Sequence, residues 1–343
     1  MLGLVSVVAS TRAAITFTTL DFPGSHFTIA AGVSGGTVVG SYEGSNGAEH
    51  GFIYNGSTFT TLDAPGATWT ECDGISGGTV VGTYYGSSGA NHGFIYDGHT
   101  IKTLDVPGAF ETFVTGISGN TVAGCYLEGD FSAHGFIYNG STFTTLDVPG
   151  AHLGSSQGTF IFGISGGTIV GYYTSNTIIP DSTHYKDNGF IYDGSTFTTL
   201  DFSESDDTKA LAVSSGIVAG TLGDQGFTYD GSTFTLFDFP LTYATPYGIS
   251  GNTIVGYYTD NYTTVHGFVA QLSEPLPRIS LTTSNRAVIA WPYPSTGWNL
   301  QQNSDLSGAN WVTPPETVGN DGTNSFILVN TSSGNRFFRL KHN

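Results

Sequence analysis

Apolar and polar residues alternate along this chain in short segments rather than in long amphipathic stretches. In residues 110–147 the segments FETFVTGIS, NTVAGCY, HGFIYNG and STFTTLD are rich in Phe, Tyr, Val, Ile and Thr, which favour strands. Gly119-Asn120 joins the first two segments and Asn139-Gly140 joins the last two. Asn-Gly pairs favour the positive φ angles of two-residue hairpins. The pattern predicts an all-β protein built from short hairpins.

The four-strand pattern is repeated along the chain. The phrase HGFIYNGSTFTTLDAPG at residues 50–66 returns almost unchanged at 92–108 and 134–150, with weaker copies starting at Asn188, Gln225 and His266. The aspartates of its TLD triplet are separated by 42 residues over three steps and then by 54 and 37; they are Asp21, Asp63, Asp105, Asp147, Asp201 and Asp238. Four-stranded units of this length match the blades of a β-propeller.

The two ends of the repeat array predict how the ring of blades closes. The array opens with a lone fourth strand, ITFTTLD at residues 15–21, and ends with a third strand, HGFVAQL at residues 266–272. Pairing of these two segments completes a sixth blade and leaves no free sheet edge. We therefore expect a six-bladed β-propeller at residues 15–273, closed by the N-terminal strand.

The composition changes after a linker at residues 274–277. Residues 278–343 hold five of the nine basic residues and three of the four tryptophans. The segments RAVIAWPYP, GWNLQQNSDL, SFILVN and RFFRLKHN predict a small C-terminal β-sandwich, somewhat like a fibronectin type III module. The pattern GWNLQQNSDLSGANW…FFRL resembles C-terminal modules of other secreted bacterial proteins. Attachment or sorting is one role that this suggests, and a structural appendage is the other.

A family resemblance covers the repeats. GISGGTIVGYY…NGFIYDGSTFTTLD resembles the HAF-type repeats of secreted bacterial proteins, with His-Gly-Phe in place of His-Ala-Phe. The resemblance spans residues 15–272 and implies an exported, β-propeller-like protein, but no activity, because the family is defined by its repeats. Residues 1–14, MLGLVSVVASTRAA, read as the remnant of a secretory signal peptide. The expected location is therefore secreted or at the cell surface, without a membrane span.

Charge restricts the class of partner. The formal net charge is −18, and residues 15–276 hold 24 acidic side chains but only three basic ones, Lys102, Lys186 and Lys209. A nucleic-acid partner is excluded, because binding its phosphates requires many Lys and Arg side chains. Cations, neutral sugars and other proteins remain. Cys72 and Cys125 are predicted to be free, because they are expected on different blades and lack neighbours at zinc spacing.

Two recurring motifs are better explained by architecture than by chemistry. The pattern G-x-S-x-G matches the nucleophile elbow of α/β-hydrolases, but that elbow joins a strand to a helix. Here the pattern falls in β-hairpins, at Ser34, Ser76 and Ser165. The recurring histidines are predicted to form structural hydrogen bonds, because Asn188 and Gln225 replace them in two units; they are His50, His92, His134 and His266. Function is therefore expected where the repetition fails.

The repetition fails most in the fourth unit, which carries insertions at residues 150–158 and 174–187. In a propeller, the loop between blades and the loop between the second and third strands emerge on one face, so both insertions should lie together. The blade-to-blade loops of the other units reach the same face. An exposed Trp69 among carboxylates suits stacking against a sugar. The predicted ligand-binding residues are Trp69, Glu71, Phe110, Glu111, His152, His184, Tyr185, Asp207 and Tyr243.

Three functions are consistent with these features. The first is an exported binding or interaction module, with a glycan or a cell-surface protein as partner. The second is an extracellular carbohydrate-active enzyme on the same face. It would be a hydrolase with Glu71 and Glu111 as paired carboxylates, or a lyase using His152, His184 and Tyr185. The third is a structural surface protein without a ligand.

The sequence assigns no catalytic residue, metal ligand or cofactor, and it leaves the oligomeric state open. Ca²⁺ is kept as a hypothesis for two acidic loops, because carboxylates and backbone carbonyls suit a hard cation. One loop holds Glu128 and Asp130, and the other holds Asp206 and Asp207.

Overall fold

The computed structural model divides into two compact units, residues 1–229 with 234–272, and residues 230–233 with 273–343. The residues described in the first unit are 15–179, 183–203, 206–229, 234–236, 243–260 and 264–272. In the second they are 230–231, 278–281, 286–292, 298–304, 310–320, 324–330 and 336–342. The expected signal remnant, residues 1–14, and the expected linker, residues 274–277, lie outside the described residues.

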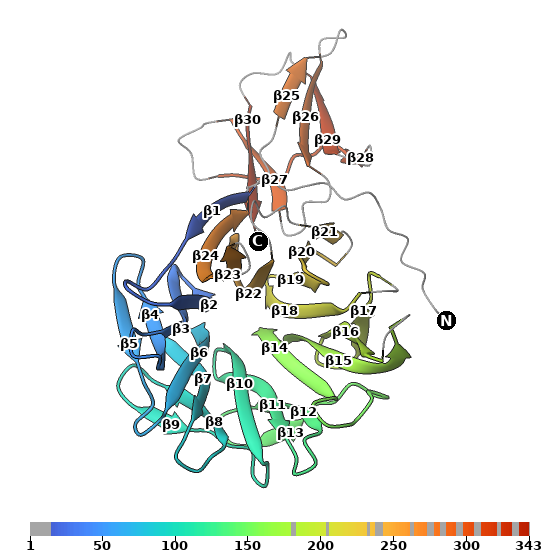
Figure 1. Ribbon diagram of the computed structural model, residues 1–343. Coiled ribbons are helices and arrows are strands. Elements are labelled where there is room, and N and C mark those ends of the chain that lie inside the picture. Colours follow the sequence, from blue (N-terminus) through green and yellow to red (C-terminus); the bar gives the residue numbers. More distant parts are fainter. Residues whose placement is uncertain are drawn as a thin grey trace. The chain divides into compact units, whose positions relative to one another are not determined.

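The first unit consists of antiparallel sheets of four strands each, which are called blades 1 to 6 below (Figure 1). Blade 1 contains β2 (Phe27–Ser34), β3 (Thr37–Glu43), β4 (Glu49–Tyr54) and β5 (Phe59–Leu62). Blade 2 contains β6 (Trp69–Ser76), β7 (Thr79–Tyr85), β8 (Asn91–Tyr96) and β9 (Ile101–Thr103). Blade 3 contains β10 (Glu111–Ser118), β11 (Thr121–Leu127), β12 (Ala133–Tyr138) and β13 (Phe143–Thr145).

The remaining blades follow the same plan. Blade 4 contains β14 (Thr159–Ser165), β15 (Thr168–Ile178), β16 (Tyr185–Tyr192) and β17 (Phe197–Leu200). Blade 5 contains β18 (Thr208–Ser214), β19 (Ile217–Leu222), β20 (Gln225–Tyr229) and β21 (Phe234–Leu236). Blade 6 contains β22 (Ala244–Ser250), β23 (Thr253–Asp260), β24 (Thr264–Leu272) and, from the other end of the array, β1 (Ile15–Thr19). The predicted all-β class is confirmed for the described residues.

The first strands of the blades are arranged around a common centre (Figure 1). Strand β2 contacts β6, and further contacts run in order through β10, β14, β18 and β22 and back to β2. Among the described residues, none forms a helix long and apolar enough to span a membrane.

The N-terminal strand completes blade 6. Strand β1 pairs antiparallel with β24, in a register that runs from Ile15 opposite Leu272 to Thr19 opposite Phe268. The contact continues beyond the strand, because the Leu20 amide donates to the Gly267 carbonyl at 2.8 Å. His266 Nδ1 also lies 2.8 Å from a carboxylate oxygen of Asp21. The predicted pairing of residues 15–21 with 266–272 is confirmed.

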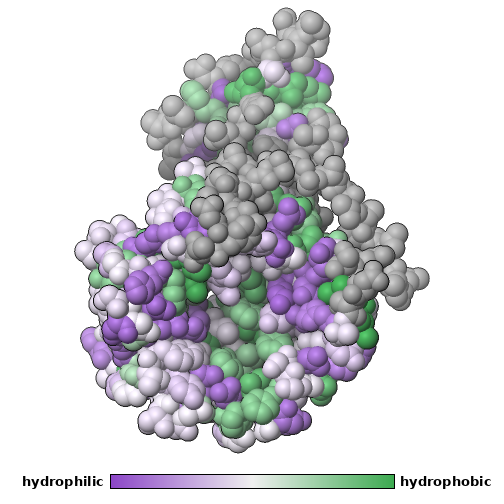
Figure 2. Space-filling view, viewed as in Figure 1, coloured by the Kyte–Doolittle hydropathy of each residue, from purple (hydrophilic) through white to green (hydrophobic). Residues whose placement is uncertain are grey.

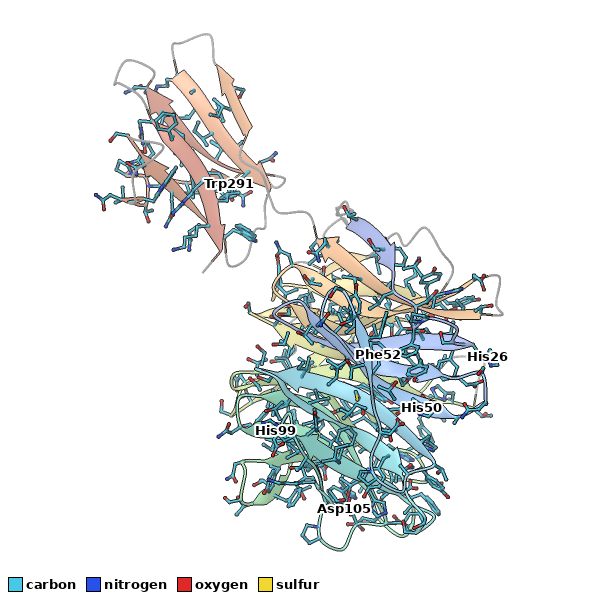
Figure 3. The ribbon with its side chains drawn as sticks, turned by 90° about the vertical axis from the view of Figure 1, so that its left-hand side faces the viewer. His26, His50, Phe52, His99, Asp105 and Trp291 are labelled. Carbon is cyan, nitrogen blue, oxygen red and sulfur yellow. The ribbon has the colours of Figure 1, made fainter. Side chains whose placement is uncertain are left out.

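Each blade has the same central contact, between a glycine of its second strand and a phenylalanine of its third. The phenylalanines are fully buried, as Phe52 illustrates in Figure 3. In blade 3, a Cβ on Gly124 would lie 2.0 Å from the Phe113 carbonyl oxygen and 3.0 Å from the Phe136 ring. The directly opposed pairs are Gly40–Phe52, Gly82–Phe94, Gly124–Phe136, Gly171–Phe190, Gly220–Phe227 and Gly256–Phe268.

The recurring histidines bind the recurring aspartates within their blades. Their Nδ1 atoms lie 2.7 to 2.9 Å from a carboxylate oxygen, in the pairs His50–Asp63, His92–Asp105, His134–Asp147 and His266–Asp21. Blade 4 has Asn188 in place of the histidine, and there the aspartate, Asp201, binds Lys186. The prediction that the histidines form structural hydrogen bonds is confirmed.

The serines of the G-x-S-x-G pattern lie at the ends of first strands, next to hairpins. Ser76 Oγ accepts a hydrogen bond from the Gly119 amide of the next blade at 3.1 Å. The preceding glycines allow neighbouring blades to approach closely, since a Cβ on Gly74 would lie 3.1 Å from the Gly116 Cα. The pattern is therefore part of the contact between blades. Cys72 and Cys125 are free, as predicted, and both are buried, on β6 and β11.

The second unit contains two sheets. One has the order β25 (Arg278–Leu281), β26 (Arg286–Pro292), β29 (Asn324–Asn330), β28 (Gly319–Asn320), and the other pairs β27 (Trp298–Asn303) with β30 (Phe337–His342). Both sheets contribute to one hydrophobic core, in which Trp291 is buried (Figure 3). Its other buried members are Ala287, Ile289, Leu300, Ile327 and Val329. The Arg336 guanidinium binds both Glu316 and Gln302.

Substitution of Gly124 tests the central contact of the blades. Gly124→Ala is expected to lower the free energy of unfolding by about 1–3 kcal/mol or more, because the added methyl group meets backbone rather than a movable side chain. Urea unfolding measures the change. Gly129→Ala is the control, because Gly129 is exposed and a Cβ there meets nothing within 4 Å. Equal unfolding midpoints for the two variants would refute the assignment.

Truncation of the opposing ring is the complementary test. Phe136→Ala is expected to cost about 3–5 kcal/mol, because it removes a fully buried ring and leaves a cavity. Phe110→Ala, at a side chain that is 47% exposed, should change the unfolding midpoint only slightly. Similar losses in both variants would show that the blade cores do not depend on this ring.

Candidate functional site

The first strand of each blade presents two side chains to the centre of the ring. Every first strand has a β-bulge, where the register with the second strand shifts by one residue. Bulges redirect side chains, and here the extra residue in each strand borders the centre. These bulge residues are Ala31, Asp73, Thr115, Phe162, Leu211 and Tyr247. Two positions earlier in the same strands lie Ile29, Glu71, Phe113, Phe160, Lys209 and Thr245.

Nine of these twelve positions line a cavity of about 380 Å³ at the centre of the ring; the exceptions are Lys209, Leu211 and Thr245. Blade 2 contributes the carboxyl groups of Glu71 and Asp73. Aromatic side chains come from blades 3, 4 and 6, namely Phe113, Phe160, Phe162, Tyr172 and Tyr247. Figure 2 shows hydrophobic and polar residues together around the middle of the ring. The cavity therefore combines an aromatic lining with two acidic groups.

The first insertion of blade 4 reaches this cavity. Ser156 lines it and has a positive φ of 60°. The Ser156 amide donates to the Phe131 carbonyl at 2.8 Å, which fixes the insertion against blade 3. A second pocket, of about 300 Å³, adjoins the cavity through the shared residues Phe162, Tyr172 and Tyr247. Lys209, Asp224, Tyr243, Thr245 and Tyr257 are among its other lining residues.

Burial controls the protonation of the two acidic groups. Burial, with a smaller contribution from the nearby carboxylates of Asp73 and Glu49, raises the pKa of Glu71 to about 9. Burial also raises the pKa of Asp73 to about 7, although hydrogen bonds from Thr83 oppose the rise. None of the described residues that line the cavity is Lys, Arg or His. The pair of Glu71 and Asp73 therefore retains protons near neutral pH that exposed carboxyl groups would have lost.

The predicted site residues are distributed over this face rather than gathered in one pocket. Glu71 lines the cavity and Tyr243 lines the second pocket. Trp69 is half-buried, and its ring stacks on Tyr85 at 6.2 Å. Phe110 is exposed and meets the Phe131 ring edge-on at 5.2 Å. The predicted stacking surface at Trp69 is therefore not part of the cavity lining.

The carboxylate pair suggested for a hydrolase, Glu71 and Glu111, is not brought together in the cavity. Glu111 starts β10, two residues before Phe113, and its Oε1 accepts a hydrogen bond from the Asn91 side chain at 3.0 Å. The carboxyl group that accompanies Glu71 is instead Asp73, the bulge residue of the same strand. A strand places residues i and i+2 on one face, which explains the different partner.

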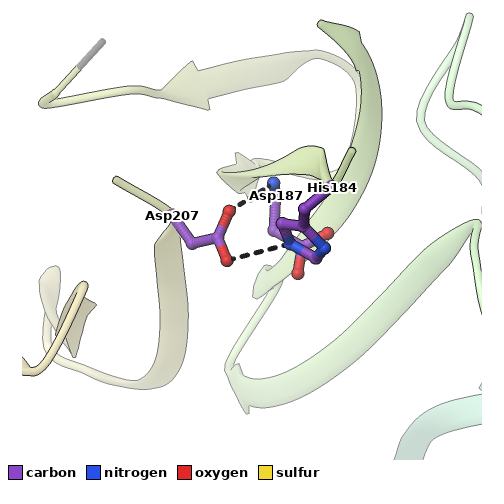
Figure 4. Close-up of side chains that lie close together, drawn as sticks. All are labelled: His184, Asp187 and Asp207. Carbon is purple, nitrogen blue, oxygen red and sulfur yellow. Dashed lines mark hydrogen bonds and ion pairs between the residues drawn. The ribbon is translucent and has the colours of Figure 1, made fainter. Parts of the chain in front are cut away.

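The two insertions of blade 4 meet each other and blade 5. The His152 ring stacks on Tyr185 at 4.0 Å, and His152 Nδ1 lies 3.0 Å from Asn176 Oδ1. His184 Nε2 lies 3.3 Å from a carboxylate oxygen of Asp207, at the entry to blade 5 (Figure 4). The prediction that both insertions lie on one face is confirmed. Residues 180–182 of the second insertion lie outside the described residues.

Among the described residues, one group of side chains has ligand atoms close enough together to hold a metal ion, and it lies where the second insertion meets blade 5. One ligand atom each from His184, Asp187 and Asp207 lie within 4.8 Å of one another (Figure 4). Asp187, however, accepts a hydrogen bond from Thr174 at 3.1 Å, and its other oxygen lies 3.1 Å from Lys209 Nζ. The lysine thus already supplies a positive charge, and we assign this group a structural role between blades 4 and 5.

The loops suggested for Ca²⁺ also have protein partners. Asp130 Oδ1 accepts hydrogen bonds from the Ser132 amide and hydroxyl, which lower the pKa of the Asp130 carboxyl. In the other loop, Asp206 accepts from Ser203 at 2.8 Å, and Asp207 contacts His184. Calcium binding stays a prediction, and these bonds would have to rearrange to free the carboxylates.

Sequence reasoning missed Asp73 and the aromatic lining. The signal lay in the alignment of the first strands: blade 2 reads WTECDGIS where blade 3 reads ETFVTGIS. The two positions that face the centre are both acidic in blade 2 and are not acidic in the other blades. This departure from the repeat concerns single residues within a strand, whereas the predicted site was drawn from loops.

No family model matches the chain, and no curated protein matches it in sequence. Among solved structures, the β-propeller domain of the Trilobed protease from Pyrococcus furiosus is similar with a TM-score of 0.46 and 11% identity, covering 74% of this chain and 97% of that one. The Aleuria aurantia lectin in complex with α-methyl-L-fucoside is similar with a TM-score of 0.44 and 13% identity, covering 92% of this chain and 98% of that one.

A puromycin-hydrolyzing peptidase from Mycobacterium tuberculosis is similar with a TM-score of 0.43 and 11% identity, covering 84% of this chain and 62% of that one. At TM-scores below 0.5, what these proteins bind or hydrolyse does not transfer to this chain.

The two acidic groups predict how stability depends on pH. Their native pKa values, about 9 for Glu71 and about 7 for Asp73, lie above the ordinary values of 4.5 and 3.8 for these side chains. The native state therefore holds protons that the unfolded chain has already lost. Stability should fall as the pH rises from about 5 to about 9. Urea midpoints at pH 5, 7 and 9 measure this loss.

Glu71→Gln should flatten the decline, because an amide cannot release a proton. Glu111→Gln is the control and should keep the wild-type slope, since Glu111 lies outside the cavity lining. Parallel curves for Glu71→Gln and the wild type would contradict the assigned protonation.

Proposed function

We propose that residues 15–272 form a closed six-bladed propeller that binds a small carbohydrate in its central cavity. The observation that carries this proposal is the composition of the cavity, in which five aromatic residues and two carboxyl groups line about 380 Å³. Binding sites for small molecules are typically concave and mostly apolar, with a few convergent polar groups. The volume is at the lower end of the range for such sites and suits one or two sugar rings.

The lining supplies both kinds of contact that a sugar needs. A pyranose has an apolar face that packs against aromatic rings, and Phe113 and Phe160 are half-buried in the cavity lining. Its hydroxyl groups need donors and acceptors. A protonated Glu71 can serve as both, and Ser41, Thr83 and Ser156 add hydroxyl groups. The first insertion takes part through Ser156, as expected if the departure from the repeat serves binding.

Catalysis by a carbohydrate-active enzyme is the second candidate, favoured by one observation. Glu71 and Asp73 share a cavity with pKa values of about 9 and 7, a separation typical of acid–base pairs. Both groups, however, belong to β6 and approach a ligand from one side. Glycosidases place two carboxyl groups on either side of the scissile bond. Binding without turnover therefore agrees better with the geometry.

Export and family membership belong to the same proposal. The HAF-type repeats and residues 1–14 support an exported protein that acts outside the cell or at its surface. The second unit is proposed to be a fibronectin type III-like sandwich, because its two sheets share one core. The glycan proposal itself rests on the cavity of the first unit.

A glycan array with the full chain, followed by calorimetric titration of the hits, tests the proposal. Phe160→Ala should weaken binding about 10-fold or more, the scale of a buried aromatic contact. Phe110→Ala, outside the cavity, should leave the affinity unchanged. Trp69→Ala tests the stacking surface that the sequence predicted. It should change the affinity only slightly, because Trp69 does not line the cavity. Incubation of each hit followed by a reducing-sugar assay tests for turnover.

Failure to bind any glycan would refute the proposal. Loss of binding in Trp69→Ala with full retention in Phe160→Ala would move the site from the cavity to the outer surface. Urea unfolding of each variant shows whether a lost affinity reflects the site or the fold.

A further inference from the structure

We propose that the ligand of the central cavity carries a protonated amine, which Glu71 and Asp73 hold. The inference rests on the proposed function, because it concerns the same cavity and names the chemistry of its ligand. It makes an amino sugar, rather than a neutral sugar, the preferred class.

Acidic groups from two blades lie together beside the cavity. Glu71 and Asp73 stand two residues apart on β6, and both line the cavity. Glu49, the first residue of β4 in the neighbouring blade, brings a third carboxyl group within hydrogen-bonding reach of Glu71. Three acidic groups therefore converge from blades 1 and 2 beside one aromatic cavity.

The second step is that no cation of the described first unit balances them. Its basic side chains other than histidine are three lysines, and each has another carboxylate. Lys186 binds Asp201, Lys209 lies 3.1 Å from Asp187, and Lys102 lies 3.7 Å from Asp97. A carboxylate that is partly withdrawn from water is costly unless a positive charge or hydrogen bonds compensate for it, and Asp73 has hydrogen bonds from Thr83 but no cation among the described lining residues. A ligand ammonium supplies the missing charge.

The third step concerns the rest of the lining. The rings of Phe113, Phe160 and Tyr172 can contact the apolar part of a ligand and attract an ammonium to their faces. The protein itself shows this contact, since Lys209 Nζ lies 4.6 Å from the centroid of the Tyr172 ring, on the side of the second pocket. An organic amine can use the carboxyl groups and the rings at once.

A metal ion fits this lining less well. The one group of described residues whose ligand atoms converge for a metal is His184, Asp187 and Asp207, and it does not include Glu71 or Asp73. Hard cations such as Ca²⁺ take six to eight oxygen ligands, whereas much of this lining is aromatic. An amine needs fewer oxygen partners and tolerates apolar neighbours.

Binding of an amine can be distinguished from binding of a neutral sugar by the number of protons released to the buffer. Without a ligand, the cavity keeps its acidic groups partly protonated, because burial and mutual repulsion raise their pKa values. An ammonium favours the ionised carboxylates, so its binding should release protons to the buffer. A neutral sugar should release few or none.

The experiment compares free-amine and acetylated forms of the same sugar on the full chain. Glucosamine and short chitosan oligomers are titrated beside N-acetylglucosamine and its oligomers at pH 6.5, where the sugar amines are largely protonated. Calorimetry in two buffers of different ionisation enthalpy counts the protons released. The free-amine forms should bind at least 10-fold more tightly and release protons.

Two variants and a matched control then locate the effect. Glu71→Gln and Asp73→Asn should each reduce the preference for the free amine by 10-fold or more. Glu111→Gln should retain it, because Glu111 is bound to Asn91 outside the cavity lining. The comparison of sugars on the wild-type protein needs no variant, so it stands even if a substitution impairs folding.

The outcomes separate the inference from the proposed function. Equal or tighter binding of the acetylated sugars would overturn the amine and leave the glycan function intact. Binding of choline or spermidine through Glu71, without binding of any sugar, would support the amine and overturn the glycan. Absence of binding by every probe would overturn both.

Discussion

The contact between a glycine on the second strand and a phenylalanine on the third determines the rest of this structure. A side chain at the glycine would collide with the backbone of the first strand, and each phenylalanine is fully buried. Because glycine has no side chain, the aromatic ring can lie against the backbone at that position. The ring supplies the packing that the glycine lacks. Because this contact recurs in all blades, each sheet has the same pleat and register, and the first strands meet the centre in equivalent positions.

That uniformity explains why the site can be asymmetric. The alternate positions of the first strands, such as Ala30, Val114 and Ile161, are buried in the cores, whereas the two inward-facing positions border the central space. Blade 2 fills them with Glu71 and Asp73, and blade 4 fills them with Phe160 and Phe162. A scaffold that fixes six equivalent positions at each level thus lets the side chain there differ from blade to blade, as Ala31, Asp73 and Phe162 do. The side chains at these positions give the cavity its acidic and aromatic lining. Ser156, in the first insertion of blade 4, adds to that lining.

The sequence predicted the parts of the structure that are repeated. The strand order, the pairing of the first strand with the last, the free cysteines and the structural histidines all follow from comparing one unit with the next. The meeting of the two insertions was also predictable, since loop direction is fixed by strand order. The cavity was not. Its inward-facing residues differ from blade to blade, so they do not appear among the repeated positions, and the repeat itself does not say which face of each first strand meets the centre. Asp73 and the aromatic lining were therefore missed, because the search compared loop lengths rather than single positions within the first strands.

The pairing of β1 with β24 has a kinetic consequence. It joins segments about 250 residues apart, and the bond between Asp21 and His266 spans 245 positions. Closing so long a loop costs about 5 kcal/mol of chain entropy before any contact is gained. Blade 6 therefore cannot assemble on the ribosome until residue 272 has emerged, whereas the earlier blades consist of contiguous segments. A stage is therefore expected in which the five contiguous sheets can already be complete while β24 still lacks its partner strand, β1. The lifetime of that stage decides how long the chain is exposed to chaperones, proteases and edge-to-edge association.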